Sequence, residues 1–185
     1  NFAVVPKGII TPAQPFATAD PARRYVGNRA FETDDGGFMV VGVSFPASGQ
    51  QYGTSFMKLN EDLSSETTFG VDGVLNRIVP AGFYPSNVVL DEDGGVLTLG
   101  GDFSIIRHLE DGTLDTTFGG DGRSDAPTPP ANFALAAMFE ATRQPDGKIV
   151  AIGWAVENGN YNHQFAAVAR YNADGTVDTD FGTDG

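Results

Sequence analysis

The sequence predicts an all-β fold, a β-propeller made of about three four-stranded antiparallel blades. One Asp- and Gly-rich segment occurs three times, at residues 62–73, 111–122 and 174–185. A second motif, an Asp-Gly turn followed by an apolar run, occurs once in each unit. The phenylalanine of the first motif recurs after 49 residues, from Phe69 to Phe118, and then after 63 residues, at Phe181. Repeats of about 50 residues that hold four short strands are typical of propeller blades.

Composition agrees with this prediction and excludes several kinds of protein. The chain has 185 residues, of which 41% are hydrophobic, and its 24 Gly and 11 Pro suit many tight turns. The net charge of −13 disfavours a nucleic-acid partner. No cysteine is present, which rules out disulfides and thiolate metal sites. No apolar run approaches the length of a membrane span, so we expect no membrane insertion.

The Asp-Gly motif predicts the second strand of each unit. Asp35-Gly36, Asp93-Gly94 and Asp146-Gly147 supply turn residues, and the runs 38–42, 96–100 and 149–153 follow them. Because these runs are apolar at nearly every position, both faces of each strand should be buried.

The other strands are placed around this one, and we label the four strands of a unit a to d in chain order. Strand a is expected at 27–33, 86–90 and 134–143, and strand c at 55–59, 104–108 and 165–171. Strand d follows the first motif, as at 74–79. Residues 134–140 are amphipathic and could form a helical turn, but they stand where the other units have a strand, so we interpret them as strand.

The units divide the chain into a leading d strand and loop at 1–28, blade 1 at 29–73, blade 2 at 74–122 and blade 3 at 123–185. Residues 6–13 resemble the d strand at 71–81, and blade 3 lacks its own. Three blades are too few to close a propeller. Two interpretations stay open: the chain is a segment of a longer propeller, or two copies form a six-bladed homodimer, each N-terminal strand completing the partner's last blade.

These motifs together resemble the delta-60 repeats of bacteria. The shared pattern is Pro-Asp-Gly-Lys-Ile-Val-x-x-Gly followed by Ala-x-x-Arg-Tyr-Asn-x-Asp-Gly-x-x-Asp-x-x-Phe-Gly-x-Asp-Gly, and residues 145–185 match it almost completely. The second unit has a short loop, and in the first unit Leu63 and Ser64 stand where the others have Gly and Thr. The resemblance implies a blade-like fold in a large secreted or surface protein. It implies no reaction and no catalytic residues.

Acidic residues with spacings of 4 and 6 form the candidate metal site. The candidate calcium ligands are Asp111, Asp115, Asp121, Asp174, Asp178 and Asp184. Carboxylate oxygens in a Gly-containing loop suit Ca²⁺. The alternative is that these residues accept hydrogen bonds from amides two residues on and cap turns. We expect no other cofactor. A basic residue ahead of each motif, at Lys58, Arg107 and Arg170, should pair with Asp115, Asp178 or their equivalents.

Ligand binding is expected where the units differ, because variable loops on a fixed scaffold commonly carry binding. The b–c loops at 45–53 and 156–163 are long, whereas that of the second unit is nearly a hairpin. The candidate ligand-binding residues of the b–c and d–a loops are Tyr52, Trp154, Asn160, Tyr161, His163, Phe83 and Tyr84. Aromatic rings among Asn and Gln suit sugars or a protein surface. The alternative is that these rings fill the ends of the blades.

No catalytic constellation is visible, since neither histidine has partners at catalytic or metal-ligand spacing. We therefore expect a non-enzymatic, extracellular or cell-surface module of bacterial origin that binds other protein subunits or copies of itself. Alternatives are a carbohydrate-binding propeller and part of a propeller hydrolase. Phe69, Phe118 and Phe181 are expected to occupy equivalent buried places.

Overall fold

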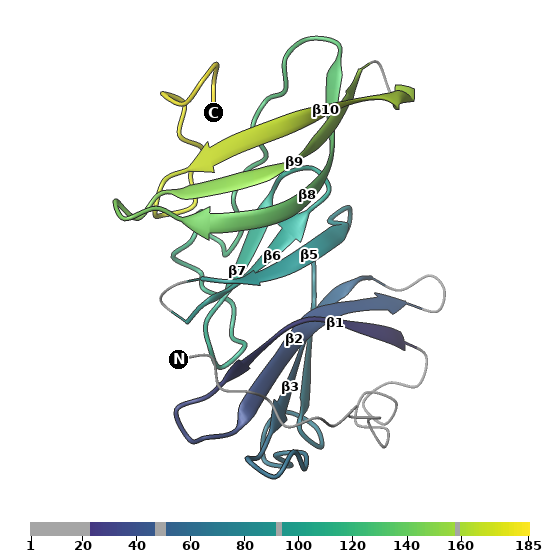
Figure 1. Ribbon diagram of the computed structural model, residues 1–185, viewed down its shortest axis with the longest axis vertical. Coiled ribbons are helices and arrows are strands. Elements are labelled where there is room, and N and C mark those ends of the chain that lie inside the picture. The colour runs from purple at the N-terminus through teal and green to yellow at the C-terminus, as the bar shows by residue number, and fades with distance from the viewer. Residues whose placement is uncertain (1–22, 47–50, 92–93, 158–159) are drawn as a thin grey trace.

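The fold is a stack of three antiparallel sheets. The computed structural model describes residues 23–46, 51–91, 94–157 and 160–185, and over this part of the chain it is all-β, with no helix that could cross a membrane. Figure 1 shows the sheets following one another along the long axis of the molecule, in chain order. This arrangement confirms the predicted all-β, blade-based fold.

Each sheet is one blade. Blade 1 contains β1 (Arg23–Glu32), β2 (Phe38–Pro46), β3 (Gly53–Leu59) and β4 (Val74–Ile78). Blade 2 contains β5 (Pro85–Leu90), β6 (Val96–Gly100) and β7 (Ile105–His108). Blade 3 contains β8 (Phe133–Arg143), β9 (Ile149–Glu157) and β10 (Asn160–Tyr171). All neighbouring strands are sequential, as in a meander.

The fourth strand differs most between the blades. In blade 1, β4 pairs with β3, so this sheet runs past the sequence-unit boundary at residue 74. In blade 2 the equivalent segment makes a single bridge between Ile106 and Arg123. Pro127, Pro129 and Pro130 follow closely and have no amide hydrogen for a ladder, which explains why this strand is short. Blade 3 has three strands within the described residues, and the strand-like segment 6–13 lies outside them.

The Asp-Gly turns form as expected where the structure describes them. In the first turn, the amide of Gly36 donates to the carbonyl of Thr33 at 2.8 Å, and Gly36 has a φ of +80°. That left-handed conformation is accessible to glycine without strain. Gly147 repeats it at +86°. Asp93, of the second turn, lies outside the described residues.

A glycine inside β2 and another inside β9 allow a bulge in the neighbouring strand. A Cβ on Gly42 would lie 1.9 Å from the carbonyl oxygen of Val26, and one on Gly153 would lie 2.0 Å from that of Ala137. The β1–β2 register shifts between Gly27 and Arg29, and the β8–β9 register shifts between Leu135 and Ala137. Glycine is therefore required where the bulged backbone approaches closely.

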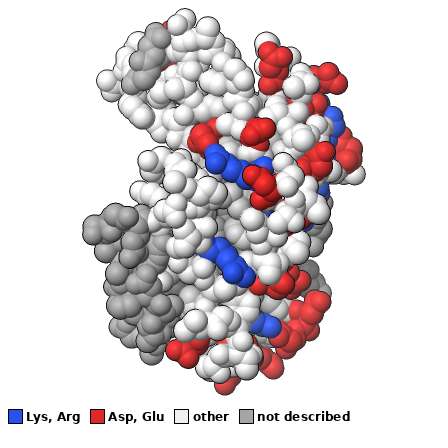
Figure 2. Space-filling view, turned by 180° about the vertical axis from the view of Figure 1, so that it is seen from behind, with Lys and Arg blue, Asp and Glu red and all other residues white. Residues whose placement is uncertain are grey.

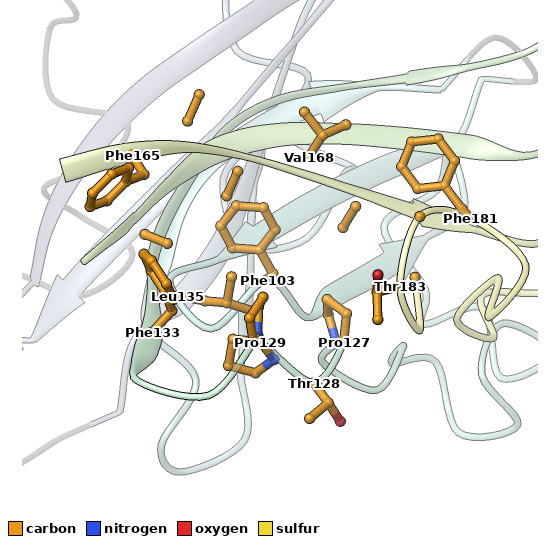
Figure 3. Close-up of a pocket in the computed structure, with 17 residues that line it drawn as sticks. Phe103, Pro127, Thr128, Pro129, Phe133, Leu135, Phe165, Val168, Phe181 and Thr183 are labelled. Atoms are coloured by element: carbon orange, nitrogen blue, oxygen red, sulfur yellow. The ribbon is translucent and has the colours of Figure 1, made fainter. Parts of the chain in front are cut away.

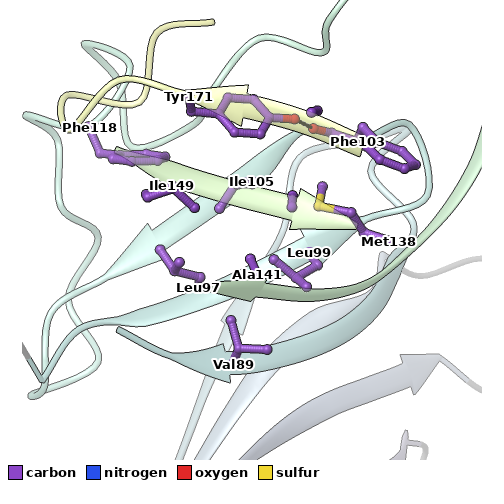
Figure 4. Close-up of a cluster of buried hydrophobic side chains, with 12 residues drawn as sticks. Val89, Leu97, Leu99, Phe103, Ile105, Phe118, Met138, Ala141, Ile149 and Tyr171 are labelled. Atoms are coloured by element: carbon purple, nitrogen blue, oxygen red, sulfur yellow. Dashed lines mark hydrogen bonds between the residues drawn. The ribbon is translucent and has the colours of Figure 1, made fainter. Parts of the chain in front are cut away.

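The cores lie between blades. The first joins blades 1 and 2 through the buried side chains of Met39, Val41, Val43, Phe56, Val88 and Val96. The second joins blades 2 and 3, and Figure 4 shows Leu97, Leu99 and Ile105 facing Met138, Ile149 and Tyr171 across it. Tyr171 donates its hydroxyl hydrogen to the carbonyl of Phe103, and burial raises the pKa of the tyrosine. Each blade is thus stabilised mainly by the blade beside it.

Polar side chains link the first strands of the three blades. Asn28 on β1 donates to Asn87 on β5 at 3.0 Å, and Asn87 in turn donates to the carbonyl of Phe139 on β8. Arg29 of blade 1 also reaches Glu140 of blade 3, at 2.7 Å. These strands therefore converge, as the innermost strands of a propeller do.

The turns and hairpin ends occupy opposite sides of the stack. In Figure 1 the β1–β2 and β8–β9 turns lie on the left and the far end of the β9–β10 hairpin lies on the right. Figure 2, seen from behind, shows acidic side chains along the right-hand edge, the side of the Asp-Gly turns. On this face, many of the acidic side chains therefore lie at the end of the blades that carries the Asp-Gly turns.

The prediction that three repeated phenylalanines are equivalently buried is wrong for two of them. Phe118 is 2% exposed within the core between blades 2 and 3. Phe69 is only partly buried against the core between blades 1 and 2. Phe181 is also partly buried, because the core it would enter lies beyond blade 3, where the described chain places no further blade.

Candidate functional site

One face of blade 3 exposes apolar side chains at positions that the other two blades bury. In blade 1, Val41 on β2 and Phe56 on β3 are cross-strand partners and fully buried against blade 2. Leu99 and Ile105 are the corresponding pair in blade 2 and are fully buried against blade 3. In both blades, the side chains at these two positions therefore pack against the next blade.

In blade 3 the same two positions are exposed. Ile152 on β9 pairs with Val168 on β10, and their exposed fractions are 47% and 52%. Trp154 and Ala166 form the adjacent pair and, because side chains alternate along a strand, share this side of the sheet. We call the side chains of Ile152, Trp154, Ala166 and Val168 the open face of blade 3. Exposed apolar positions that are buried elsewhere in the same repeat mark an interaction surface.

The outer edge of blade 3 adjoins a cavity. Within the described residues, β10 pairs with β9 on one side and forms the edge of its sheet on the other. A cavity of about 410 Å³ lies beside it, and Figure 3 shows Phe165 and Phe181 at opposite ends of it, with Pro127, Pro129 and Phe133 along its lower side. The lining is mostly apolar, which suits a hydrophobic chain segment rather than a polar small molecule.

The candidate ligand-binding aromatics fall into two groups. The Tyr52 ring packs edge-on against Phe45 at 5.8 Å and against Tyr84 at 5.5 Å. Tyr84 is 62% exposed, but Phe83 is 1% exposed in a small core with Val79 and Ile106. Phe83 therefore fills the end of the blade and offers no surface to a ligand, as the alternative interpretation expected.

The second group lies on the β9–β10 hairpin. Trp154 packs edge-on against Tyr161 at 6.0 Å, and Tyr161 is 66% exposed. His163 lies 3.5 Å from Glu157, and the side chain of Asn160 accepts from the amide of Asn162. No described contact joins this group to Tyr52 and Tyr84.

The interpretation of residues 156–163 as a long loop is wrong. β9 extends to Glu157 and β10 begins at Asn160, with Asn160 paired to Glu157 and Gln164 to Val156. Asn and Gly are poor strand formers, so cross-strand pairing rather than local propensity carries the hairpin this far, with a register shift between Asn160 and Gln164. Trp154 is thus a strand residue on the open face. Residues 47–50 and Asn158, of the other loop predictions, lie outside the described residues.

The candidate calcium ligands make turn-capping hydrogen bonds. Asp111 Oδ1 accepts from the amide and hydroxyl of Thr113 at 2.8 and 2.6 Å, and Asp174 does the same with Thr176 at 3.0 and 2.7 Å. These bonds lower the pKa of both carboxyls. Asp121 accepts from the amide of Arg123, and Asp184 has a left-handed backbone with a φ of +59°. Calcium binding stays a prediction.

Asp115 and Asp178 also take part in ion pairs. Arg107 pairs with Asp115, and Arg170 reaches Asp178 Oδ2 at 2.6 Å, as the sequence predicted. Hydrogen bonds from Thr117 and then Arg107 lower the pKa of Asp115, and bonds from Lys148 and Arg170 lower that of Asp178. Lys58 differs, since it pairs at 2.7 Å with Asp35 of the Asp-Gly turn.

A histidine lies buried between blades 1 and 2. His108 is 3% exposed, packs edge-on against Phe56 at 5.4 Å, and has a buried Nδ1 without a hydrogen-bond partner. It lines a cavity of about 640 Å³ together with Arg77, Asp121 and Arg123. Burial, and to a lesser degree the charge of Arg77, lowers the pKa of His108 to about 4. His108 is therefore neutral at pH 7.

Sequence reasoning missed the open face. Its signal was present, because Val41, Leu99 and Ile152 stand at the same place relative to the repeated glycine of the second strand. Aligned positions of a repeat should be buried alike unless a neighbouring repeat is missing.

The stacked sheets, repeated turns and inter-blade cores define a β-propeller repeat protein. Residues 144–181, in the third repeat, match the family model described as "Domain of unknown function (DUF5122) beta-propeller". This match supports membership of the repeat in a β-propeller family. No curated protein matches the chain. No solved structure matches it either.

Proposed function

We propose that the chain is a non-enzymatic structural module of a bacterial delta-60-type propeller, located outside the cell or on its surface, which binds further protein subunits through the open face of blade 3. The observation that carries this proposal is the exposure of Ile152 and Val168 at positions that are fully buried in the other two blades. The acidic surface and the absence of cysteine are compatible with this role but do not decide it.

The reverse face of blade 1 supplies a matching surface on the same chain. Phe38 and Val40 on β2 stand at the positions of Ile149 and Ala151, which are fully buried between blades 2 and 3. Phe38 and Val40 are only partly buried, beside Met57 and Leu59. A second copy could therefore place its blade 1 on the open face with the packing already used twice within the chain.

Lysine at both exposed positions should weaken this association strongly. Ile152 and Val168 are already about half buried in the single chain, so their full burial would add about half of the usual 1.5–3 kcal/mol each, and 1.4 kcal/mol corresponds to a tenfold change in affinity. We therefore expect Ile152→Lys/Val168→Lys to raise the dissociation constant of the assembly at least ~10-fold, measured by sedimentation over a concentration series. Both side chains already contact water, so the melting temperature of the dissociated chain should change little.

Val71→Lys is the matched control, because Val71 is also an exposed valine, at 62%, in the turn that precedes β4. Val71→Lys should leave the mass of the assembly in solution as it is in the wild type. A wild-type chain that is monomeric at all concentrations and captures no subunit would contradict the proposal.

Carbohydrate binding is the second candidate, and the Trp154–Tyr161 pair favours it, since an indole beside an exposed phenol offers an apolar surface for a sugar ring. This alternative predicts glycan-array binding that both Trp154→Ala and Tyr161→Ala abolish. Tyr84→Ala, in the separate aromatic group, should leave the binding intact. Array binding that survives both hairpin substitutions would exclude this site.

A further inference from the structure

We propose that the cavity between blades 1 and 2 binds a small zwitterion of the amino-acid type, which carries one carboxylate, one ammonium group and an apolar body. This inference goes beyond the proposed function, because the cavity lies between β4 and the last segment of blade 2, whereas the open face belongs to blade 3. Its volume of about 640 Å³ is within the range of pockets that hold small molecules.

Two opposite charges line this cavity without pairing with each other. Arg77 on β4 donates from Nε to the carbonyl of Gly112 at 2.8 Å, and its two terminal amino groups have no partner among the described residues. Asp121 of blade 2 accepts from the amide of Arg123 through one carboxylate oxygen, at 3.0 Å, and forms no ion pair within the described chain. Arg77 is thus anchored with two donors left for a carboxylate, and Asp121 has an oxygen left for an ammonium group.

The third charged side chain of the cavity is already neutralised. Arg123 pairs with Asp102 at 2.9 Å and also donates to the hydroxyl of Ser104. Arg77 and Asp121 remain, so the charges that line the cavity balance, whereas the whole chain carries a net charge of −13. A ligand with one charge of each sign matches this balance, and the acidic protein does not repel it as it would repel an anion.

His108 adds a neutral polar group that the other blades do not have. Its place in the repeat is that of Leu59 in blade 1 and of Tyr171 in blade 3. Tyr171 donates its hydroxyl hydrogen to a backbone carbonyl, but Nδ1 of His108 has no partner. The strand register likewise places Ala126 where blade 1 has Arg77. A role in the repeated fold would be expected in every blade, so these two groups, which occur once, indicate a binding site.

The apolar wall of the cavity suits the body of the ligand. Ile78 on β4 and Leu114 of blade 2 are 51% and 43% exposed, and both line the cavity with the buried Val79 and Ile106. Aliphatic side chains from two blades would therefore lose contact with water when an alkyl group enters between them.

Isothermal titration calorimetry with two zwitterions tests the charge pattern. The probes are L-leucine, whose charges are adjacent, and ε-aminocaproate, whose charges are separated by an alkyl chain. We expect at least one of them to bind, and the one that binds more tightly reports how far apart the two charges are held. The same molecules without one charge are isocaproate and isopentylamine for leucine, and caproate and hexylamine for aminocaproate. Each should bind at least ~10-fold more weakly, because it lacks one set of charge-assisted hydrogen bonds.

Substitutions assign the binding to this cavity. Arg77→Gln and Asp121→Asn should each raise the dissociation constant of the zwitterion at least ~10-fold. Asp121→Asn keeps the side-chain oxygen that accepts from the amide of Arg123, so the turn should stay folded, which the melting temperature checks. The matched controls are Asp72→Asn, the equivalent carboxylate of blade 1, and Arg24→Ala, an exposed arginine on β1 at the opposite edge of the blade 1 sheet. Both should leave binding unchanged.

Failure of both probes to bind at millimolar concentration overturns the proposal. Binding that either Arg77→Gln or Asp121→Asn leaves unchanged also overturns it. A molecule with a single charge that binds as tightly as its zwitterion does so too, since one of the two protein charges would then be unused. None of these results bears on the proposed function, which sedimentation of the open-face variants tests separately.

Discussion

Phe118→Ala will lower the free energy of unfolding by about 3–5 kcal/mol, the usual cost of deleting a buried phenylalanine ring. Phe118 is 2% exposed in the core that holds blades 2 and 3 together. A Cβ on Gly175 would lie 2.9 Å from its ring, so the turn of blade 3 closes directly over it. The loss should be measured by urea unfolding of the dissociated chain, with the slope of the transition checked for a change in cooperativity.

Phe181→Ala is the matched control for Phe118→Ala, because Phe181 stands at the equivalent position of the next repeat. Phe181 is partly exposed, and the guanidinium of Arg170 lies 4.5 Å from its ring centre. We expect about 1 kcal/mol for its removal, because little buried surface is lost in the single chain. Equal losses for the two variants would show that the two positions are equally packed, which would contradict the partial exposure of Phe181.

Stability will fall as the pH is lowered from about 6.5 to about 4, and His108 will be a main cause. Its folded pKa of about 4 lies below the ordinary value of 6.5. Between these values the unfolded chain binds a proton that the folded chain does not, so protonation favours unfolding. At 1.36 kcal/mol for each pH unit, the full effect is about 3 kcal/mol. It is absent above pH 6.5 and complete near pH 4.

His108→Leu should flatten this part of the pH profile, since blade 1 has Leu59 at the equivalent position, 3% exposed. His163→Gln is the control, because His163 lies on the surface beside Glu157. Denaturant unfolding at several pH values between 4 and 7 measures the slope. A pH dependence that persists in His108→Leu and disappears in His163→Gln would contradict this prediction, because it would show that His163 causes the loss of stability.

The strands and turns could be predicted because their signals are local. Asp35-Gly36 and Asp146-Gly147 specify turns through backbone preferences, and the apolar runs that follow become β2 and β9. Residues 134–140 form strand rather than helix, as their place in the repeat indicated. Repetition supplied what a single segment could not, because three copies of one pattern must share one local structure.

The candidate site could not be predicted in the same way, because it depends on contacts between blades, which the sequence pattern of one repeat does not contain. Asp91 has a fully buried side chain between Arg107 of its own blade and Arg143 of the next, and no motif marked it. The exposure of Ile152 depends on a neighbour and not on its own sequence context. The extended β9–β10 hairpin comes from residues outside the repeat pattern, where cross-strand pairing outweighs a weak strand propensity.

The ion pair between Arg29 and Glu140 reports how tightly the three blades curve around their first strands. It joins the first strands of blades 1 and 3 across 2.7 Å, although blade 2 lies between these sheets. Side chains can bridge alternate blades only where the central channel is narrow. A wide ring of many blades would separate these two strands and break the pair. The geometry of the three blades thus favours a small circumference, and the exposed Arg29–Glu140 pair reports this curvature rather than imposing it.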